Sequence, residues 1–225
     1  MIEKKSLSFD FLDENPEKIK EDVFVVPAKE KEIVFIEYFK EYYSSFSEFA
    51  KRHLMTKSPK YFLWAIWVVG IGNTIDRTAT SSSNGWVEAW VTALFGGVLA
   101  GAFTYYIAGW FYQVRVKWSK GIDDIDTARN IYIFSLLPIS VISIGSLFFN
   151  SISYGDDYFI KYASDSSQVD TLFAFFSLIS IVYSIRISYK AAKEVMKAKK
   201  NHAIFWFIIS PVIFYILIFA NAILE

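Results

Sequence analysis

The sequence predicts an all-α membrane protein, a bundle of five transmembrane helices preceded by an N-terminal cytoplasmic amphipathic helix. Hydrophobic residues occupy 54% of its 225 positions and aromatic residues 19%, which is more apolar surface than a soluble domain of this length can bury. These residues gather in five stretches. Lys and Arg alternate between high and low numbers in the successive connections, which is typical of helical membrane proteins.

Five apolar stretches form the predicted transmembrane domain, residues 58–225. The first stretch is short, and the other four are long enough for a hydrocarbon core of about 30 Å, which needs roughly 20 helical residues. We expect Ser58 to cap the first helix and Pro59 to take its first position, where no N–H is needed. A re-entrant or interfacial first segment is the alternative. The spans cover approximately residues 59–75, 86–112, 131–149, 169–187 and 203–224.

The basic residues predict the orientation of these spans. From the N-terminal segment through the four loops to the C-terminal tail, Lys and Arg number 11, 1, 4, 1, 6 and 0. Cytoplasmic connections carry the excess of Lys and Arg in membrane proteins. The alternation therefore predicts five crossings, with the N-terminus cytoplasmic and the C-terminus extracytoplasmic. The Phe-, Ile- and Lys-rich composition suits a bacterial inner membrane, which is the expected location.

The cytoplasmic N-terminal segment, residues 1–57, divides near residue 30. Its first part is charged and irregular, which favours an extended or disordered chain. Residues 33–55 instead have an aromatic face and a polar face on a helical wheel, with Tyr43 on the apolar half and Ser47 on the polar half. This helix is expected in the headgroup region or beneath the bundle, and docking of a partner protein is the alternative. Its predicted interfacial residues are Phe35, Phe39, Tyr42, Phe46 and Phe49.

Small residues and prolines mark expected features of the helix packing. Pro138 in the third span and Pro211 in the fifth each remove a backbone hydrogen bond, so both are expected to kink their helices. In the second span a stripe of small residues at intervals of four or eight predicts close contact between helices. Packing inside the monomer is the favoured use of this stripe, and a homo-oligomer is the alternative. The stripe contains Ala93, Gly97, Gly101 and Gly109.

The residue types needed for catalysis are scarce. The chain has no cysteine, which excludes disulfides, thiolate nucleophiles and Cys-based zinc or iron–sulfur sites. His53 and His202 lack the further ligands of a zinc site, and Glu88 lies near the end of its span. We therefore expect no catalytic residue, no cofactor, no metal and no nucleic-acid partner. An intramembrane enzyme would place ionisable groups near the bilayer centre, and this chain places none there.

One acidic cluster in the second loop permits two interpretations. Asp123, Asp124 and Asp126 precede the third span. Their spacing does not fit an EF-hand loop, which distributes its oxygen ligands over twelve positions. Capping of the third helix by Asp124 or Asp126 is the prediction, because a carboxylate at a helix N-terminus accepts free N–H groups and complements the dipole. A divalent-ion site is the alternative.

Several short motifs resemble, in their order, the prokaryotic Yip-domain proteins. Ser58-Pro59-Lys60-Tyr61 precedes an apolar run with Gly70 that closes at Asp76-Arg77. The further motifs are Gly109-Trp110, Gly121, Ala128-Arg129, Leu137-Pro138 and Glu194-Val195. The resemblance marks Pro59, Asp76, Arg77, Gly121 and Pro138 as family-motif positions over about residues 58–224, and it implies a five-span, N-terminus-in arrangement.

Two departures from the family pattern limit what the resemblance implies. The family often has a Gly pair where this chain has Lys120-Gly121. The Asp-Leu-Tyr-Gly-Pro segment of eukaryotic members, which interact with Rab/Ypt GTPases, is absent here. The resemblance therefore implies fold and topology rather than the GTPase role. From the sequence we expect a non-catalytic membrane protein that organises or recruits membrane or cytoplasmic partners, and a small transporter, channel or lipid-handling protein is the alternative.

Overall fold

The computed structural model describes residues 35–78, 85–155, 157–160 and 168–224. Every regular element within these ranges is helical, as predicted. The internal contacts of the chain divide it into two units, Met1–Tyr38 and Phe39–Glu225. The described part of the first unit is the first turn of α1 (Phe35–Ser44), in which Phe35 is exposed. Residues 1–34, for which the sequence predicts an extended chain over the first thirty, lie outside the described part.

The segment predicted as a single helix over residues 33–55 is divided. After α1 come α2 (Phe46–Phe49) and a π-helical turn, η2 (Ala50–Leu54). Ser45 separates α1 from α2 with φ −152° and ψ 87°, an extended conformation. A helical wheel assumes an unbroken helix, so the break changes which side chains share a face. The wheel is consequently wrong for Ser47, which follows the break and is buried, whereas Tyr43 lies in α1 before the break and is 55% exposed.

The predicted cap of the first apolar helix is also wrong. α3 (Phe62–Thr78) begins after Tyr61 rather than at Pro59. The backbone N–H of Phe62 donates to the carbonyl of Pro59 at 3.2 Å, which closes a turn. Tyr61 has φ 59°, a left-handed conformation through which a right-handed helix does not continue. Ser58 therefore lies outside the helix and is exposed.

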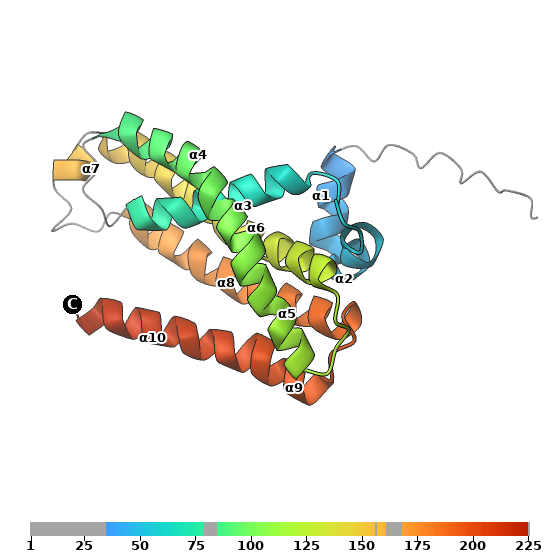
Figure 1. The fold of residues 1–225 in the computed structure, drawn as a ribbon. Helices are drawn as coiled ribbons and strands as arrows, with labels where there is room; N and C mark the ends of the chain where they lie inside the picture. The colour runs from blue at the N-terminus through green and yellow to red at the C-terminus, as the bar shows by residue number, and fades with distance from the viewer. Residues whose placement is uncertain (1–34, 79–84, 156, 161–167, 225) are drawn as a thin grey trace, which may run out of the picture. The chain divides into compact units, whose positions relative to one another are not determined.

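Two long helical rods contain π-helical turns (Figure 1). The first consists of α4 (Trp86–Phe103), η3 (Thr104–Ala108) and α5 (Gly109–Trp118). The second consists of α9 (Lys200–Ile204), η4 (Phe205–Ile209) and α10 (Ser210–Leu224). Along the chain, three further helices come between the two rods: α6 (Ile125–Tyr154), the short α7 (Asp157–Ile160) and α8 (Gln168–Glu194).

Within the described residues, four helical segments are long and apolar enough to cross a membrane, and they correspond to the second to fifth predicted spans. α3 has 17 residues, about 26 Å at roughly 1.5 Å per residue. Its apolar part ends at Ile75. The shorter length anticipated for the first span is therefore present in the structure, and the count of five crossings stays a prediction. The four long segments are Trp86–Trp118, Ile125–Tyr154, Thr171–Glu194 and Lys200–Leu217.

α6 packs against α3, α5 and α8, and different connections meet at its two ends. Near its start, the Asn130 side chain donates to the Leu54 carbonyl, and the backbone N–H of Ile122 donates to the Met196 carbonyl. Near its finish, Trp86 Nε1 donates to the Gly155 carbonyl at 2.6 Å. We call the end that contains residues 39–60, 115–130 and 186–202 the basic end.

α3 and α4 touch along glycine backbones. A Cβ atom on Gly70 would overlap the backbone of Gly97 and Gly101. A Cβ on Gly97 would lie 2.7 Å from Ile71 Cγ1 and 2.9 Å from the Ile71 nitrogen. Ala93 packs in the same contact, beside Ile71 and Ile75. The absence of side chains lets the two helices approach closely, which is how small residues strengthen helix contacts in lipid.

Gly109 lies on a different contact from the other three residues of the predicted stripe. A Cβ atom there would lie 2.7 Å from Arg129 Cγ on α6, whereas Gly97 and Gly101 face α3. The cause is η3, which lies between Gly101 and Gly109. A π-helical turn contains an extra residue and rotates everything that follows it about the helix axis. A constant spacing of four therefore does not keep the four residues on one face.

Candidate functional site

The basic end is organised around the proline of α6. Pro138 has no N–H, so the Phe134 carbonyl four residues earlier loses its helical donor. The Tyr42 hydroxyl donates to that carbonyl at 2.8 Å. Tyr42 and Phe134 are both fully buried. Burial, followed by the nearby Tyr43 and Tyr183, raises the pKa of Tyr42 well above its ordinary value. Tyr42 therefore stays protonated and remains a donor at physiological pH.

Further contacts fix residues 42–56 to the first half of α6. The Phe49 ring packs between Tyr42, at 5.4 Å, and Phe134, at 5.7 Å between ring centroids. The Asn130 amide is fully buried, and its nitrogen donates to the carbonyls of Leu54, at 3.0 Å, and Thr56, at 2.7 Å. Because a buried carbonyl without a donor is costly, these bonds hold the end of η2 at α6.

Charged side chains join the two sides of the break at Ser45. Glu41 on α1 forms ion pairs with Arg52 at 2.9 Å and with His53 at 3.2 Å, both on η2. Lys51 donates to Glu48 at 2.7 Å, and this hydrogen bond lowers the pKa of Glu48. Glu41 and Glu48 are thus already paired within this segment. The exposed Lys51–Glu48 pair contributes little to stability, but both carboxylates already have basic partners.

Two loops of the basic end pair through their backbones. α5 is followed by Lys120 with φ 56°, and α8 is followed by Lys197 with φ 56°. The N–H of Ile122 donates to the Met196 carbonyl at 2.7 Å, and the N–H of Lys199 donates to the Ser119 carbonyl at 2.8 Å. A Cβ on Gly121 would lie 2.7 Å from the Met196 carbonyl oxygen. Glycine is needed there for the two backbones to approach.

The acidic cluster of the same loop caps α6 and pairs with α5. Asp124 is the N-cap: its side chain accepts the N–H of Asp126 at 3.1 Å and that of Thr127 at 3.3 Å. The predicted capping is thereby confirmed, with Asp124 as the residue responsible. Asp123 forms an ion pair with Lys117 at 2.7 Å and accepts a hydrogen bond from Gln113. The Lys117 hydrogen bond, chiefly, lowers the pKa of Asp123.

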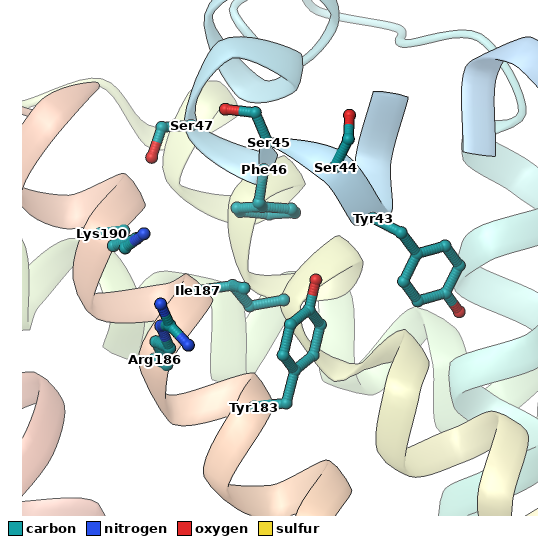
Figure 2. Close-up of a pocket in the computed structure, with 9 residues that line it drawn as sticks. All are labelled: Tyr43, Ser44, Ser45, Phe46, Ser47, Tyr183, Arg186, Ile187 and Lys190. Carbon is teal, nitrogen blue, oxygen red and sulfur yellow. The ribbon is translucent and has the colours of Figure 1, made fainter. Parts of the chain in front are cut away.

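A pocket of about 190 Å³ opens at the basic end, between the N-terminal segment and α8 (Figure 2). Phe46 and Ile187 face each other across it, and Tyr183 points its hydroxyl toward the N-terminal segment. The rings of Tyr43 and Tyr183 are stacked with their centroids 6.5 Å apart. Arg186 and Lys190 line the α8 side. The remaining lining residues are Ser44, Ser45 and Ser47.

The interfacial residues predicted from the sequence differ in their surroundings. Tyr42, Phe46 and Phe49 are buried, whereas Phe39 is half-buried and contacts Trp64 edge-on at 5.3 Å. The sequence analysis did not identify Arg186 and Lys190 as a site, because it counted them only as cytoplasmic charges. Their four-residue spacing on α8 was the available signal. Their neighbours from α1 and α2 could not be inferred from that spacing.

The remaining predicted positions divide between the two ends of the bundle and the second rod. Pro59 is buried at the basic end. Asp76 and Arg77 lie in the last turn of α3, and their side chains lie outside the described part of the structure. Pro211 is the second residue of α10 and comes just after η4, where the N–H of Ser210 donates to the Phe205 carbonyl. This wider turn relieves the clash of a proline ring with the fourth preceding carbonyl. Kinking at Pro138 and Pro211 stays a prediction.

The comparisons with known proteins identify one family. No curated protein and no solved structure matches the chain. The family model described as the Yip1 domain matches residues 43–221, which begins within α1 and ends within α10. The matched region therefore contains the pocket residue Tyr43, the paired loops and the four long apolar segments of the described residues. Since this match covers well over half of the chain, the protein belongs to the Yip1 domain family of multi-pass membrane proteins.

Proposed function

We propose that this protein is a non-catalytic, five-span membrane protein that recruits or organises partners at its cytoplasmic face. The basic end is the surface on which the proposal rests. The N-terminal segment, the α5–α6 loop and the α8–α9 loop are joined there by buried or backbone hydrogen bonds. Lys193, Lys197, Lys199 and Lys200 remain exposed around them. A fixed surface with free cations suits the docking of an acidic segment of another protein.

The grouping of connections at the two ends supports the proposed orientation. The three connections rich in Lys and Arg share the basic end, and the start of α4 meets the finish of α6 at the other end. With α3 as the first crossing, this arrangement favours a cytoplasmic N-terminus and an extracytoplasmic C-terminus. A bacterial inner membrane is the proposed location.

Single-cysteine labelling tests the orientation directly, because the chain has no native cysteine. Lys197→Cys lies at the basic end and Ser153→Cys at the other, and both positions are exposed. In intact cells a membrane-impermeant maleimide should label Ser153→Cys alone, and Lys197→Cys should react only after permeabilisation. The reverse pattern would contradict the orientation, and labelling of both in intact cells would contradict the number of crossings.

Recruitment is tested by a photo-crosslinking amino acid placed at Lys200 in native membranes. Phe95, which is 74% exposed on α4, provides the lipid-facing control. The Lys200 site should give a discrete protein adduct that weakens when Lys193 and Lys197 are both replaced by Glu, because charge reversal opposes an acidic partner. Adducts with lipid alone at both sites would refute recruitment through the basic end.

A small transporter, channel or lipid-handling protein is the second candidate. It is favoured by η3 and η4, since π-helical turns inside longer helices occur frequently at functional sites. At η3 the Asn73 side chain donates to Thr104 Oγ1 at 2.9 Å, between α3 and the first rod. Reaction of Asn73→Cys with an impermeant aqueous reagent would indicate a water path through the bundle and favour this candidate.

A further inference from the structure

The pocket between the N-terminal segment and α8 has an excess of positive charge. Arg186 and Lys190 line it, and none of its lining residues is acidic. Neither cation forms an ion pair within the described ranges of the chain. The nearest carboxylates of the N-terminal segment, Glu41 and Glu48, are already paired with that segment's own Arg52, His53 and Lys51. The charge of the pocket therefore favours an anionic ligand.

Hydroxyl groups supply donors beside the two cations. Tyr43, Tyr183, Ser45 and Ser47 line the pocket together with Ser44. Tyr183 directs its hydroxyl toward the N-terminal segment, and the Ser47 hydroxyl lies on the side of Lys190 (Figure 2). A phosphate presents several oxygens at once, so it can accept from a guanidinium, an ammonium and hydroxyl groups together. A carboxylate would use fewer of these donors.

The position of the cations along α8 indicates which phosphate is available. Leu178, Val182, Arg186 and Lys190 follow one another at intervals of four residues, so each shares a face of the helix with the next. Leu178 is 52% exposed and Val182 60% exposed, as expected for side chains that face acyl chains. Arg186 follows Val182 by one turn, about 6 Å along the axis. The face thus passes from apolar to cationic within one turn, which is the depth of a lipid headgroup.

We propose that this pocket binds the phosphate of an anionic glycerophospholipid. Arg186 and Lys190 bind the phosphate oxygens, Tyr183 and Ser47 donate hydrogen bonds, and the acyl chains lie along Leu178 and Val182. Because residues 43–47 form the opposite wall, a bound headgroup also links the N-terminal segment to α8. This site is independent of partner recruitment, which uses other residues of the basic end.

Native mass spectrometry of the detergent-purified chain tests the site with phosphatidylglycerol, phosphatidylcholine and inorganic phosphate as probes. The parent should retain phosphatidylglycerol in preference to phosphatidylcholine. Arg186→Gln with Lys190→Gln should reduce that retention by about tenfold or more, since both charge-assisted bonds to the phosphate are lost. Tyr183→Phe should reduce it less. Arg186 and Lys190 are both exposed, so the melting temperature of their double variant without lipid should stay unchanged.

A matched pair separates a specific pocket from general surface charge. Lys193→Gln with Lys200→Gln removes the same charge from exposed positions that do not line the pocket, and it should change retention by about twofold or less. Equal losses in the two double variants would overturn the proposal. Binding of inorganic phosphate with no preference for phosphatidylglycerol would overturn the lipid assignment. If the photo-crosslinked partner adduct at Lys200 is absent but phosphatidylglycerol is retained, the recruitment proposal fails and the lipid site stands.

Discussion

α6 and α10 are both apolar helices of one membrane protein, yet they have different surroundings. Mean hydropathy reaches 2.1 in Ile125–Tyr154 and 1.4 in Lys200–Leu217. In the most apolar stretch of each, 44% of the residues are buried inside the protein in the first and 11% in the second. Of these two segments, the more hydrophobic one is thus the more buried, and the part of α10 that lies within Lys200–Leu217 exposes Ile213, Phe214 and Ile216.

The difference follows from small and polar residues rather than from hydrophobicity. α6 buries Asn130, Ser135, Ser140 and Asn150, and glycines of α3 and α5 lie against it. Lipid solvates a Leu or Phe as well as another helix does, so apolar side chains alone give helices little reason to associate. Close backbone contact and hydrogen bonds do. The described part of α10 offers large apolar side chains to its surroundings, and lipid accommodates them.

Gly72→Leu is expected to have the largest effect. A Cβ on Gly72 would lie 2.7 Å from both Cα and Cβ of Ser140, so a larger side chain must separate α3 from α6. Overpacking of this kind costs about 1–3 kcal/mol or more, measurable as a lower midpoint of thermal unfolding in detergent. Ile216→Phe adds bulk to α10 at a position that is 60% exposed, and it should leave the midpoint unchanged. Similar midpoints for the two variants would contradict the contrast between α6 and α10.

Tyr42→Phe should have an intermediate effect, because it removes the donor that satisfies the Phe134 carbonyl. A hydrogen bond of this kind contributes about 0.5–1.5 kcal/mol. In a Pro138→Ala background the new Ala N–H can donate to the same carbonyl, so Tyr42→Phe should cost less there. A double-mutant cycle of unfolding free energies measures this coupling. Equal costs in the two backgrounds would show that Pro138 does not create the acceptor for Tyr42.

The comparison also separates what the sequence can predict from what it cannot. Apolar length predicted the long helices, and carboxylate chemistry predicted the cap of α6, because both depend on local sequence. The break at Ser45 and the turn at η3 were not predicted, since neither interrupts the apolar pattern. Each changes the face on which later residues lie. The single stripe of Ala93, Gly97, Gly101 and Gly109 and the wheel position of Ser47 were wrong for that reason.

The candidate site was less predictable than the fold. Tyr42 was predicted as an interfacial aromatic, but its bond to Phe134 joins residues 92 positions apart. Arg186 and Lys190 become a site only when residues 43–47 close the pocket over them. Such pairings depend on tertiary structure and leave no local pattern. The loop at Lys120 is an exception. The family often has a glycine where this chain has Lys120, which already indicates from the sequence that the backbone there has a conformation that favours glycine.

Lys120→Gly should have the smallest effect of the three and the opposite sign. Lys120 has φ 56°, and left-handed backbone costs a non-glycine residue about 1–2 kcal/mol. Glycine removes that strain but has more conformational entropy to lose on folding, which offsets about 0.5–1 kcal/mol. A net stabilisation of about 0.5–1 kcal/mol remains, seen as a higher midpoint in the same detergent.

Gly121→Ala provides the contrast within the same loop. Its Cβ would lie 2.7 Å from the Met196 carbonyl oxygen and so separate the paired loops, which should lower the midpoint. Lys120→Gly should therefore raise the midpoint and Gly121→Ala should lower it. Position 120 needs a left-handed backbone, whereas position 121 needs close approach of another backbone. If Lys120→Gly lowered the midpoint instead, the Lys120 side chain would have to stabilise the basic end by more than its backbone strain costs, and the loop conformation would not explain the family's glycine pair.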